Sequence, residues 1–464
     1  MKDKLKKIND TEWILSKELR EGMNVDAHII ANDLVMKQME NAAIEQLTNV
    51  AMLPGVINSI WGMPDMHWGY GLPMGAVGAF DEHEGIISSG LTGFDINCGI
   101  NLINTNLKYS EVQKKLKELI PALFKNIPCG VGSKGKLRVN DIHDVLVNGV
   151  DWAIEQGYGV KKDKVRTEEL GRMDGADPLK VSETAKKRGK PQLGTLGAGN
   201  HFLEVQRVSD ILDSKFAKKY ELEKDNAMIM LHCGSRGLGH EIASDYLKIH
   251  EEAAKKYKIK LPDPQLVCAP AQSKEGQDYF AAMKCAVNYA FANRLVMTQW
   301  IRETFEQIFK KEWESMNMHT VYAIAHNICK LENFKIDGKK KKIYIHRKGA
   351  TRSYPDTPVI IAGSMGTASY LLKGTEEAER TFYSSCHGAG RVMSRNQAIS
   401  QFKGNEIKRK LAEEGRIVQS TSPEVLAEEA PEAYKDVDEV VDSVHNAKIS
   451  LRVARMVPMG TVKG

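Results

Sequence analysis

The chain has 464 residues, a formal net charge of +5, 42% hydrophobic residues and 27% charged residues. These values are typical of a soluble globular protein with a sizeable core, and they exclude collagen-like repeats, coiled coil and disorder as the dominant state. There is no run of about 18 apolar residues and no apolar segment behind the basic N-terminus, so we expect a cytoplasmic protein that does not enter a membrane. The seven cysteines are scattered, which favours reduced thiols over a disulfide framework.

Three segments have the spacing of amphipathic helices. Apolar residues four positions apart predict one helix over residues 33–53, ended by a Pro-Gly pair. Ser110 and Gln113 have the spacing of a capping box, which predicts that a second helix begins there. The longest pattern predicts a soluble helix over residues 277–311, in which polar side chains such as Arg294 argue against a membrane span.

Two further segments are rich in basic residues. Residues 161–190 contain ten Lys or Arg, six Asp or Glu and few large apolar side chains. Such a composition predicts a basic insertion or mobile segment, at about residues 130–190, that projects from the core. Later, Asp337 and Gly338 lie between two alternating segments and predict a hairpin turn, with Lys339–Lys342 at its mouth.

Eight segments are dense in Gly, His, Asp, Cys and Arg, and each lies between ordinary strand or helix patterns, where loops usually carry function. They are MPDMHWGYGLPMG (63–75), GFDINCGI (93–100), GTLGAGNHFLEV (194–205), LHCGSRGLGHE (231–241), AHNICKLE (325–332), HRKGATRSYP (346–355), AGSMGTASY (362–370) and CHGAGRVMSR (386–395).

Metal ligation is the first chemical interpretation of these segments. Asp95 and Cys98 are three residues apart in one loop, and His201, His232 and His326 each stand at the end or start of an apolar segment. If the thiolate or the carboxylate bridges, these five residues would bind two divalent ions and leave open positions for a substrate. A cysteine ligand favours zinc over manganese. The alternative is that each histidine is an ordinary core or surface residue.

Phosphate binding is the second interpretation. GTLGAGN, GSRGLG and HGAGR combine small residues, which let backbone N–H groups approach an anion, with a nearby Asn or Arg. Arg236, Arg391 and Arg395 are the cations of these loops. Glycine-rich loops are also common as tight turns without a ligand, and arginine is usually a surface residue.

The sequence leaves more than one role for His387 and for His67. His387 is flanked by Gly388 and Arg391, which indicates an accessible imidazole beside an anion site and therefore a candidate nucleophile. It could equally be a sixth metal ligand or a plain loop residue. His67 and Trp68 could form an exposed stacking and acid/base group, or a buried aromatic turn.

The motifs GFDINCG, GNHFLE, LHCGSRGLGH, AHN, GSMGTASY, HGAGR and the final Lys463-Gly464 together resemble the RtcB family of RNA-splicing ligases, from about Asp65 to Gly464. The resemblance implies one catalytic domain over residues 1–464 with an α+β fold of packed β-sheets and surrounding helices. It also implies an enzyme dependent on GTP and manganese that joins an RNA 3′-phosphate or 2′,3′-cyclic phosphate end to a 5′-hydroxyl end, in tRNA splicing or RNA repair.

By motif position, the resemblance assigns two Mn²⁺ ions to Asp95, Cys98, His201, His232 and His326, with Cys98 as the bridge. Manganese then replaces the zinc that ligand softness favours. His387 would be the nucleophile that carries GMP covalently before GMP passes to the RNA 3′-phosphate. The GTP-binding residues would be Asn200, His201, Phe202, Leu203, Glu204, His326, Asn327, Ala362, Gly363, Ser364, Met365, Ser369, His387, Gly388, Ala389, Gly390, Tyr434 and Lys463.

In this assignment Glu204 accepts hydrogen bonds from the guanine N1 and N2 hydrogens, which adenine does not offer. RNA would be held through its phosphates, with Arg236, Arg391, Arg395, Lys348 and Arg352 as candidate contacts. Family membership also suggests an archease-like activating partner in some organisms, and the sequence leaves the oligomeric state open.

Two other functions fit the same residues. A metal-dependent phosphoesterase would open cyclic phosphate ends without GTP or a nucleophilic histidine. A non-catalytic RNA-binding scaffold would depend on the basic segment and would not need the five metal ligands.

Overall fold

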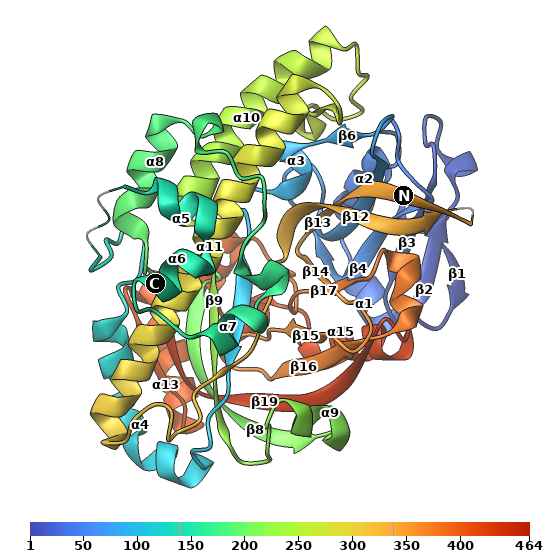
Figure 1. Ribbon diagram of the computed structural model, residues 1–464. Helices are drawn as coiled ribbons and strands as arrows, with labels where there is room; N and C mark the ends of the chain where they lie inside the picture. The colour runs from blue at the N-terminus through green and yellow to red at the C-terminus, as the bar shows by residue number, and fades with distance from the viewer. Residues whose placement is uncertain (138, 140, 337) are drawn as a thin grey trace.

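The computed structural model describes residues 1–137, 139, 141–336 and 338–464. Across these residues two large β-sheets are surrounded by helices, which confirms the expected α+β fold (Figure 1). None of the described helices combines the length and the apolar character needed to cross a membrane.

The first large sheet contains the N-terminal part of the chain and a later hairpin. In spatial order its described strands are β1 (Lys6–Asn9), β2 (Glu12–Leu15), β3 (Asp26–Ile30), β4 (Ser59–His67), β5 (Met74–Asp81), β13 (Lys339–Lys348) and β12 (Asn327–Ile336). Neighbouring strands are antiparallel except β3 and β4, which are parallel. The β12–β13 hairpin is the one predicted from sequence; Gly338 has a φ of +78°, while Asp337 lies outside the described residues.

The second large sheet carries most of the predicted functional loops. Its described strands are β11 (Thr320–Ala323), β7 (Gly99–Ile103), β9 (Ala227–Cys233), β8 (Phe202–Ile211), β19 (Ser450–Lys463), β16 (Ser369–Gly374) and β15 (Pro358–Ile361), with β18 (Ile417–Ser420) parallel to β19. Two short pairs connect the layers: β6 (Ile86–Ile87) with β10 (Ala269–Pro270), and β14 (Ala350–Arg352) with β17 (Ser384–Cys386).

The helices cover the sheets on the outside. Their bounds are α1 (Asp33–Gln38), α2 (Asn41–Val50), α3 (Ser89–Thr92), α4 (Tyr109–Asn126), α5 (His143–Asn148), α6 (Val150–Glu155), α7 (Lys161–Val165), α8 (Glu183–Gly189), α9 (Ser214–Lys219), α10 (Arg236–Lys256), α11 (Lys274–Phe309), α12 (Arg395–Gln401), α13 (Gly404–Glu413), α14 (Pro423–Glu428) and α15 (Val437–Asn446).

Helix α11 is the central support of the second sheet. It covers Lys274–Phe309, close to the predicted 277–311, and most of its side chains are buried. It packs against β9 on the inside and against α4, α5, α6 and α10 on the outside (Figure 1). A helix enclosed on nearly all sides explains why its apolar residues extend beyond a single stripe.

Two helix predictions need correction. The single helix expected over residues 33–53 is two helices, because Met39 is extended (φ −71°, ψ 131°). The Lys2 ammonium donates to the carbonyls of Lys37 and Met39, and backbone N–H of Lys2 donates to Asn41 Oδ1, so the N-terminus satisfies the peptide groups at the break.

The capping box expected at Ser110 and Gln113 is also wrong. Helix α4 begins at Tyr109, and the backbone N–H of Lys108 donates to Glu111 instead. Lys108 forms a β-bridge with Asn226, and its ammonium donates to Asn226 Oδ1 at 2.7 Å. This tertiary contact sets the start of the helix, which sequence spacing did not reveal.

The basic segment at residues 161–190 forms short helices beside α10 and α11. Its Asp163 is 1% exposed and accepts from both terminal nitrogens of Arg302, on α11, at 2.9 and 2.7 Å. Thr320 Oγ1 donates to the same carboxylate at 2.7 Å. The division into one domain with an insertion at about 130–190 stays a prediction, and residues 138 and 140 lie outside the described part of the chain.

Asp163→Ala should lower the free energy of unfolding by about 3–5 kcal/mol, because it leaves the buried Arg302 guanidinium without its counter-charge. Burial opposes ionisation of Asp163, but Arg302 outweighs it and holds the pKa of this carboxyl below its usual value. The stabilisation is therefore present at neutral pH and is lost as the pH falls through the folded-state pKa. Denaturant unfolding measures the change in the free energy of unfolding.

Asp174→Ala is the matched control in the same segment. Asp174 is 87% exposed, so its loss should cost under about 1 kcal/mol. Equal losses in the two variants would contradict a stabilising role for the buried Asp163–Arg302 pair.

Candidate functional site

Strand register brings the predicted metal ligands to one end of the second sheet. Gly99 of β7 is paired with Cys233 of β9, so Cys98, in the loop before β7, lies beside the end of β9. His232 is paired with Phe202 of β8, and His201 immediately precedes that strand. His326 lies between β11 and β12, and its backbone N–H donates to the Cys98 carbonyl at 2.9 Å.

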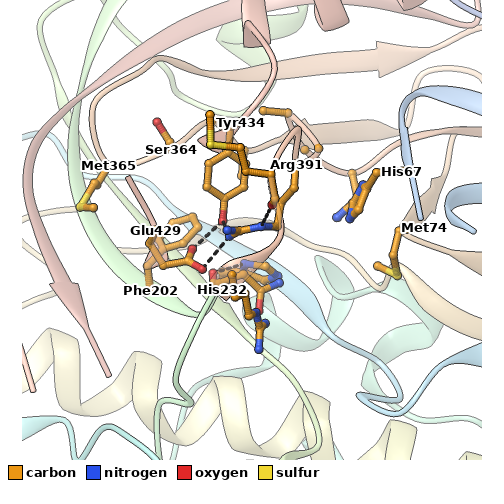
Figure 2. A pocket seen from close by; sticks show the side chains of 18 of the residues that line it. His67, Met74, Phe202, His232, Ser364, Met365, Arg391, Glu429 and Tyr434 are labelled. Carbon is orange, nitrogen blue, oxygen red and sulfur yellow. Dashed lines mark hydrogen bonds and ion pairs between the residues drawn. The ribbon is translucent and has the colours of Figure 1, made fainter. Parts of the chain in front are cut away.

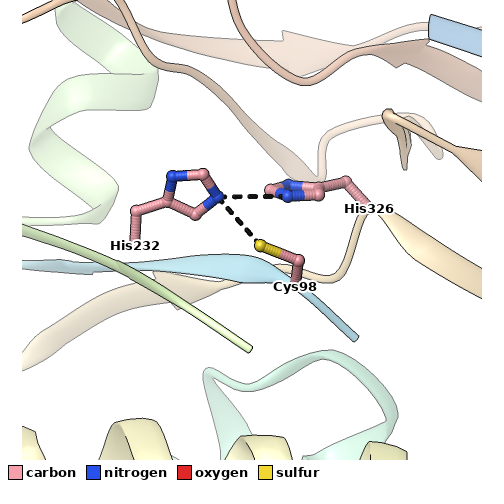
Figure 3. Close-up of side chains that lie close together, drawn as sticks. All are labelled: Cys98, His232 and His326. Carbon is pink, nitrogen blue, oxygen red and sulfur yellow. Dashed lines mark hydrogen bonds between the residues drawn. The ribbon is translucent and has the colours of Figure 1, made fainter. Parts of the chain in front are cut away.

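The five side chains form two groups that share Cys98. In one group, Cys98 Sγ lies 3.1 Å from His232 Nε2, which lies 3.2 Å from His326 Nε2 (Figure 3). In the other, Cys98 Sγ lies 3.3 Å from His201 Nε2, which lies 2.8 Å from Asp95 Oδ2. The structure thus brings together all five residues that the sequence analysis grouped, with the thiol in the middle.

The charge states of this cluster suit a metal ion. Burial, reinforced by neighbouring histidines, holds the pKa of His232 and His326 well below the usual range, so both imidazoles are neutral. Burial and the Asp95 charge raise the pKa of the Cys98 thiol well above its usual value. Although burial opposes it, the His201 ring lowers the pKa of Asp95 to about 2. A divalent cation would supply the positive charge that a thiolate at this position needs.

The orientation of the donors fits a metal as well. His232 Nδ1 lies 3.0 Å from the Asn200 carbonyl, which directs Nε2 toward Cys98 and His326. His232 Nε2, the nitrogen that the Asn200 carbonyl leaves without a proton, lies 3.2 Å from His326 Nε2 and 3.1 Å from Cys98 Sγ. Imidazole nitrogen, thiolate and carboxylate together form a donor set suited to transition metals.

Helix α11 holds the two loops that carry these ligands. Arg294, which is 1% exposed, donates to the carbonyls of Asn97 and Cys233, both at 2.8 Å. Asn293 donates to the Gly234 carbonyl at 3.2 Å. A Cβ at Gly234 would lie 2.3 Å from Asp95 Oδ1, so this position needs glycine. The sequence analysis used Arg294 only as an argument against a membrane span and missed its role here; a charged residue inside an apolar helical pattern was the available signal.

His387 lies beside the metal cluster and is oriented by Asp65. Its ring centroid is 4.7 Å from that of His326. His387 Nδ1 lies 2.6 Å from Asp65 Oδ2, and this carboxylate, 0% exposed, also accepts from the His387 backbone N–H at 3.1 Å. Nε2 of the ring is therefore the nitrogen available to a ligand. Asp65 was in a segment noted from sequence, but its partner 322 residues away could not be inferred from it.

The backbone after His387 passes close to Asp65. Gly390 has a φ of +76°, and a Cβ there would lie 2.2 Å from the Asp65 carbonyl oxygen. This close approach is by itself enough to require glycine at position 390, so the glycine does not need a phosphate-binding role to explain it.

A cavity of about 590 Å³ opens in front of His387 and His232 (Figure 2). It is lined by fourteen of the residues predicted from sequence to bind nucleotide or metal: Asn200, Phe202, Glu204, His232, Ala362, Gly363, Ser364, Met365, His387, Gly388, Ala389, Gly390, Tyr434 and Lys463. Its size is that of a site for a small organic ligand.

A second part of the cavity lining, around Glu204 and Glu429, is rich in paired polar groups. Glu204 accepts from Gln206 Nε2 at 2.6 Å and Thr461 Oγ1 at 2.8 Å, and burial raises its pKa to about 7. Lys463 donates to Glu429 at 2.9 Å. Glu429 also accepts from the Tyr434 hydroxyl at 2.5 Å and from Arg391 at 3.1 Å. Sequence analysis missed Glu429, which has no motif around it.

Five of the residues predicted to bind GTP are not in the cavity lining: His201, Leu203, His326, Asn327 and Ser369. The two histidines belong to the metal cluster, and Leu203 is in the hydrophobic core because successive strand residues face opposite sides. Asn327 donates to the Asp95 carbonyl, and Ser369 Oγ accepts from Gln206 and from the Gly363 backbone.

The candidate RNA-binding cations differ in their surroundings. Lys348 is 3% exposed and donates to the Tyr70 carbonyl, and Arg352 is paired with Glu169 at 2.7 Å. Arg236 donates to Thr195 Oγ1 at 3.1 Å. Arg395, 57% exposed on the rim of the cavity, is the most accessible of the five.

Comparison with known proteins identifies close relatives. The family model described as tRNA-splicing ligase RtcB matches residues 46–464. A Thermococcus kodakarensis protein named tRNA-splicing ligase RtcB is 51% identical over 99% of both chains. Proteins of the same name from Methanococcus maripaludis and Archaeoglobus fulgidus are each 50% identical, over 100% and 99% of both chains respectively.

Removing the shared thiol should abolish both metal sites, whereas removing a ligand of one group should spare the other. We expect two Mn²⁺ per wild-type chain, none retained by Cys98→Ala and one retained by His201→Ala, because only Cys98 contributes to both groups. Metal content after dialysis, measured by mass spectrometry, checks this. Cys268→Ala, a buried thiol in the core of the first sheet, is the control and should keep two ions. Two ions in Cys98→Ala would rule out a bridging thiolate.

Proposed function

Because the chain belongs to the RtcB family, as its motifs predicted, we propose that it is an RNA ligase that acts in tRNA splicing. In finer detail, we propose that it joins RNA 3′-phosphate or 2′,3′-cyclic phosphate ends to 5′-hydroxyl ends with GTP as the consumed nucleotide. The same chemistry would serve the repair of broken RNA.

One observation carries this proposal: an imidazole fixed by a buried carboxylate stands beside two groups of metal-binding donors on one cavity. A phosphoesterase would need the donors but not the fixed imidazole. An oriented nucleophile is the element that a group-transfer reaction through a covalent enzyme intermediate requires.

In the first proposed step, His387 Nε2 attacks the α-phosphorus of GTP. A nitrogen–phosphorus bond forms, the bond from the α-phosphorus to the bridging oxygen breaks, and pyrophosphate leaves. Asp65 keeps the proton on Nδ1 and stabilises the positive charge that develops on the ring, as a carboxylate does beside a catalytic histidine. The product is GMP held on His387.

In the later steps, an oxygen of the RNA 3′-phosphate displaces His387 from GMP, and an RNA 3′-diphosphate guanosine results. The 5′-hydroxyl oxygen of the second RNA end then attacks the RNA phosphorus and releases GMP, which leaves a 3′,5′-phosphodiester. A cyclic phosphate end would first be hydrolysed to the 3′-monophosphate. Activation as an anhydride supplies the leaving group that the 3′-phosphate lacks.

Asp95, Cys98, His201, His232 and His326 would hold two Mn²⁺ ions, which supply charge neutralisation for phosphate oxygens and polarise the phosphorus under attack. The donor set supports transition metals in general. The choice of manganese over zinc comes from the family resemblance alone.

Guanine selection would take place at Glu204. As a carboxylate, Glu204 would accept from guanine N1–H and N2–H, while Lys463, in the same lining, approaches the remaining edge. Ser369 lies behind the lining, so the contact to the base that the resemblance implies for it would act only through Gln206. Tyr434 and Phe202 contribute aromatic surface against a base. An archease-like activating partner and a cytoplasmic location remain predictions.

Incubation with Mn²⁺ and α-labelled GTP should leave acid-labile label on the wild-type protein and none on His387→Ala. Asp65→Ala should be labelled at least about 100-fold more slowly, because the imidazole loses its orientation and its proton position. The label is measured on denatured protein at a series of times.

His83→Ala, which removes an exposed histidine outside the cavity lining, is the control and should be labelled like wild type. Equal labelling of wild type and His387→Ala would refute the guanylyl-histidine. No label on metal-loaded wild type, together with opening of cyclic phosphate ends, would favour the phosphoesterase.

Guanosine affinity should rise with pH, by up to about tenfold between pH 6 and pH 8, because burial raises the pKa of Glu204 to about 7 and only the carboxylate accepts both guanine hydrogens. Glu204→Gln should bind guanosine weakly at every pH in this range. Isothermal titration with guanosine, which carries no phosphate to titrate, measures the effect. Affinity that falls as the pH rises would contradict a carboxylate contact to the base.

A further inference from the structure

Trp68 is an exposed tryptophan at the rim of the cavity. Its side chain is 58% exposed, whereas large aromatic residues are normally mostly buried. Of the large hydrophobic side chains exposed in the described part of the chain, Trp68 and Tyr257 are the aromatic ones. Tyr257 already has partners within the protein, because its hydroxyl donates to Glu275 and the Lys256 ammonium lies over its ring. Within the same residues the Trp68 ring has no aromatic or cationic neighbour.

The backbone that carries Trp68 is fixed on both sides. Its N–H donates to Glu40 at 2.8 Å, and Gly69 exchanges hydrogen bonds with the Gln46 side chain of α2 at 3.1 and 2.5 Å. On the other side, His67 Nδ1 lies 2.9 Å from the Asp65 carbonyl. The ring is therefore presented to solvent from a rigid support, so a partner that stacks on it pays little for ordering the loop.

Trp68 is also close to the reacting groups. It follows the last residue of β4 and lies three positions after Asp65, which contacts His387. Three residues of extended chain span at most about 10 Å. The Trp68 backbone therefore lies within about 10 Å of Asp65, the residue that orients His387, and both Trp68 and His387 line the same cavity.

The proposed contacts of the guanine base lie on another side of the cavity from this ring. His67 and Met74, which pair across β4 and β5, lie on the opposite side of the cavity from Met365 and Phe202 (Figure 2). The Trp68 side of the rim is therefore free for a second ligand that must reach His387.

We propose that Trp68 is a stacking platform for a nucleobase of the RNA end that reacts at His387. This inference rests on the proposed ligase function and adds a subsite to it. Every base has a π-face, so an aromatic platform positions an RNA end without selecting its sequence. Arg395, 57% exposed on the same rim and paired with Glu428 at 3.0 Å, offers further N–H donors to the phosphate of such a strand.

The test separates RNA binding from the nucleotide step. Trp68→Ala should raise the KM for RNA ends in ligation by roughly 5- to 100-fold, the range of base–aromatic stacking. Labelling of His387 by α-labelled GTP, which needs no RNA, should be unchanged. Trp68→Phe should restore most of the RNA affinity, because it keeps a flat ring. Tyr257→Ala, the other exposed aromatic residue, is the matched control and should ligate like wild type.

A second comparison tests whether the group that contacts Trp68 is a base of the RNA. An RNA end with an abasic terminal nucleotide should lose as much affinity for the wild type as Trp68→Ala loses for intact RNA, and the variant should not distinguish the two substrates. An unchanged KM for RNA in Trp68→Ala overturns the proposal. So does a changed KM for GTP in the labelling of this variant. A change in its oligomeric state while its RNA affinity stays intact would overturn the proposal as well. Absence of label on wild type would instead refute the ligase function itself.

Discussion

The site depends on one buried cation. Arg294 lies inside α11 and donates to the carbonyls of Asn97 and Cys233 and to the Asn97 side chain. Burial lowers the pKa of its guanidinium to about 10, so it remains charged at neutral pH. An unpaired charge in a protein interior is costly, and here the backbone carbonyls of the loop before β7 and of the end of β9 compensate it. That loop carries Cys98 and that strand carries His232, so one helix sets the separation of these two ligands.

The same positive charge lies near a cluster in which Asp95 is ionised while the Cys98 thiol and the His232 and His326 imidazoles are neutral. Without a metal, the thiol holds its proton and the buried imidazoles are uncharged, which keeps the sum of buried charge small. Binding of a divalent ion would release the thiol proton, so metal affinity and pH are coupled at this site. The rigid support by α11 means that the donors are arranged before the ion arrives, and little chain entropy is lost on binding.

Two parts of the cavity lining have different physical characters. His387 and His232 are each held in one orientation, by Asp65 or by a backbone carbonyl. Around Glu429, in contrast, Lys463, Arg391 and Tyr434 all contact the same carboxylate, so a nucleotide that binds them must exchange protein contacts for its own. Selectivity for a base arises naturally from such an exchange, because a ligand that cannot replace the lost hydrogen bonds leaves buried groups unpaired.

By itself the sequence determined which segments carry the chemistry, the family, and the long helix at Lys274–Phe309, because residue identity and helical periodicity are local properties. It grouped Asp95, Cys98 and the three histidines correctly as neighbours. The resemblance also named Cys98 as the shared residue, and its position between the two groups of donors agrees with that. Only the tertiary structure decided that Asp65 orients His387, that Glu429 contacts Lys463 and Arg391, and that Arg294 supports the segments that carry Cys98 and His232. It also broke the helix at Met39 and moved the start of α4 to Tyr109 through the contact with Asn226. The physical reason is that pairing between strands and contacts across hundreds of residues depend on register and packing, which no local pattern of residues specifies.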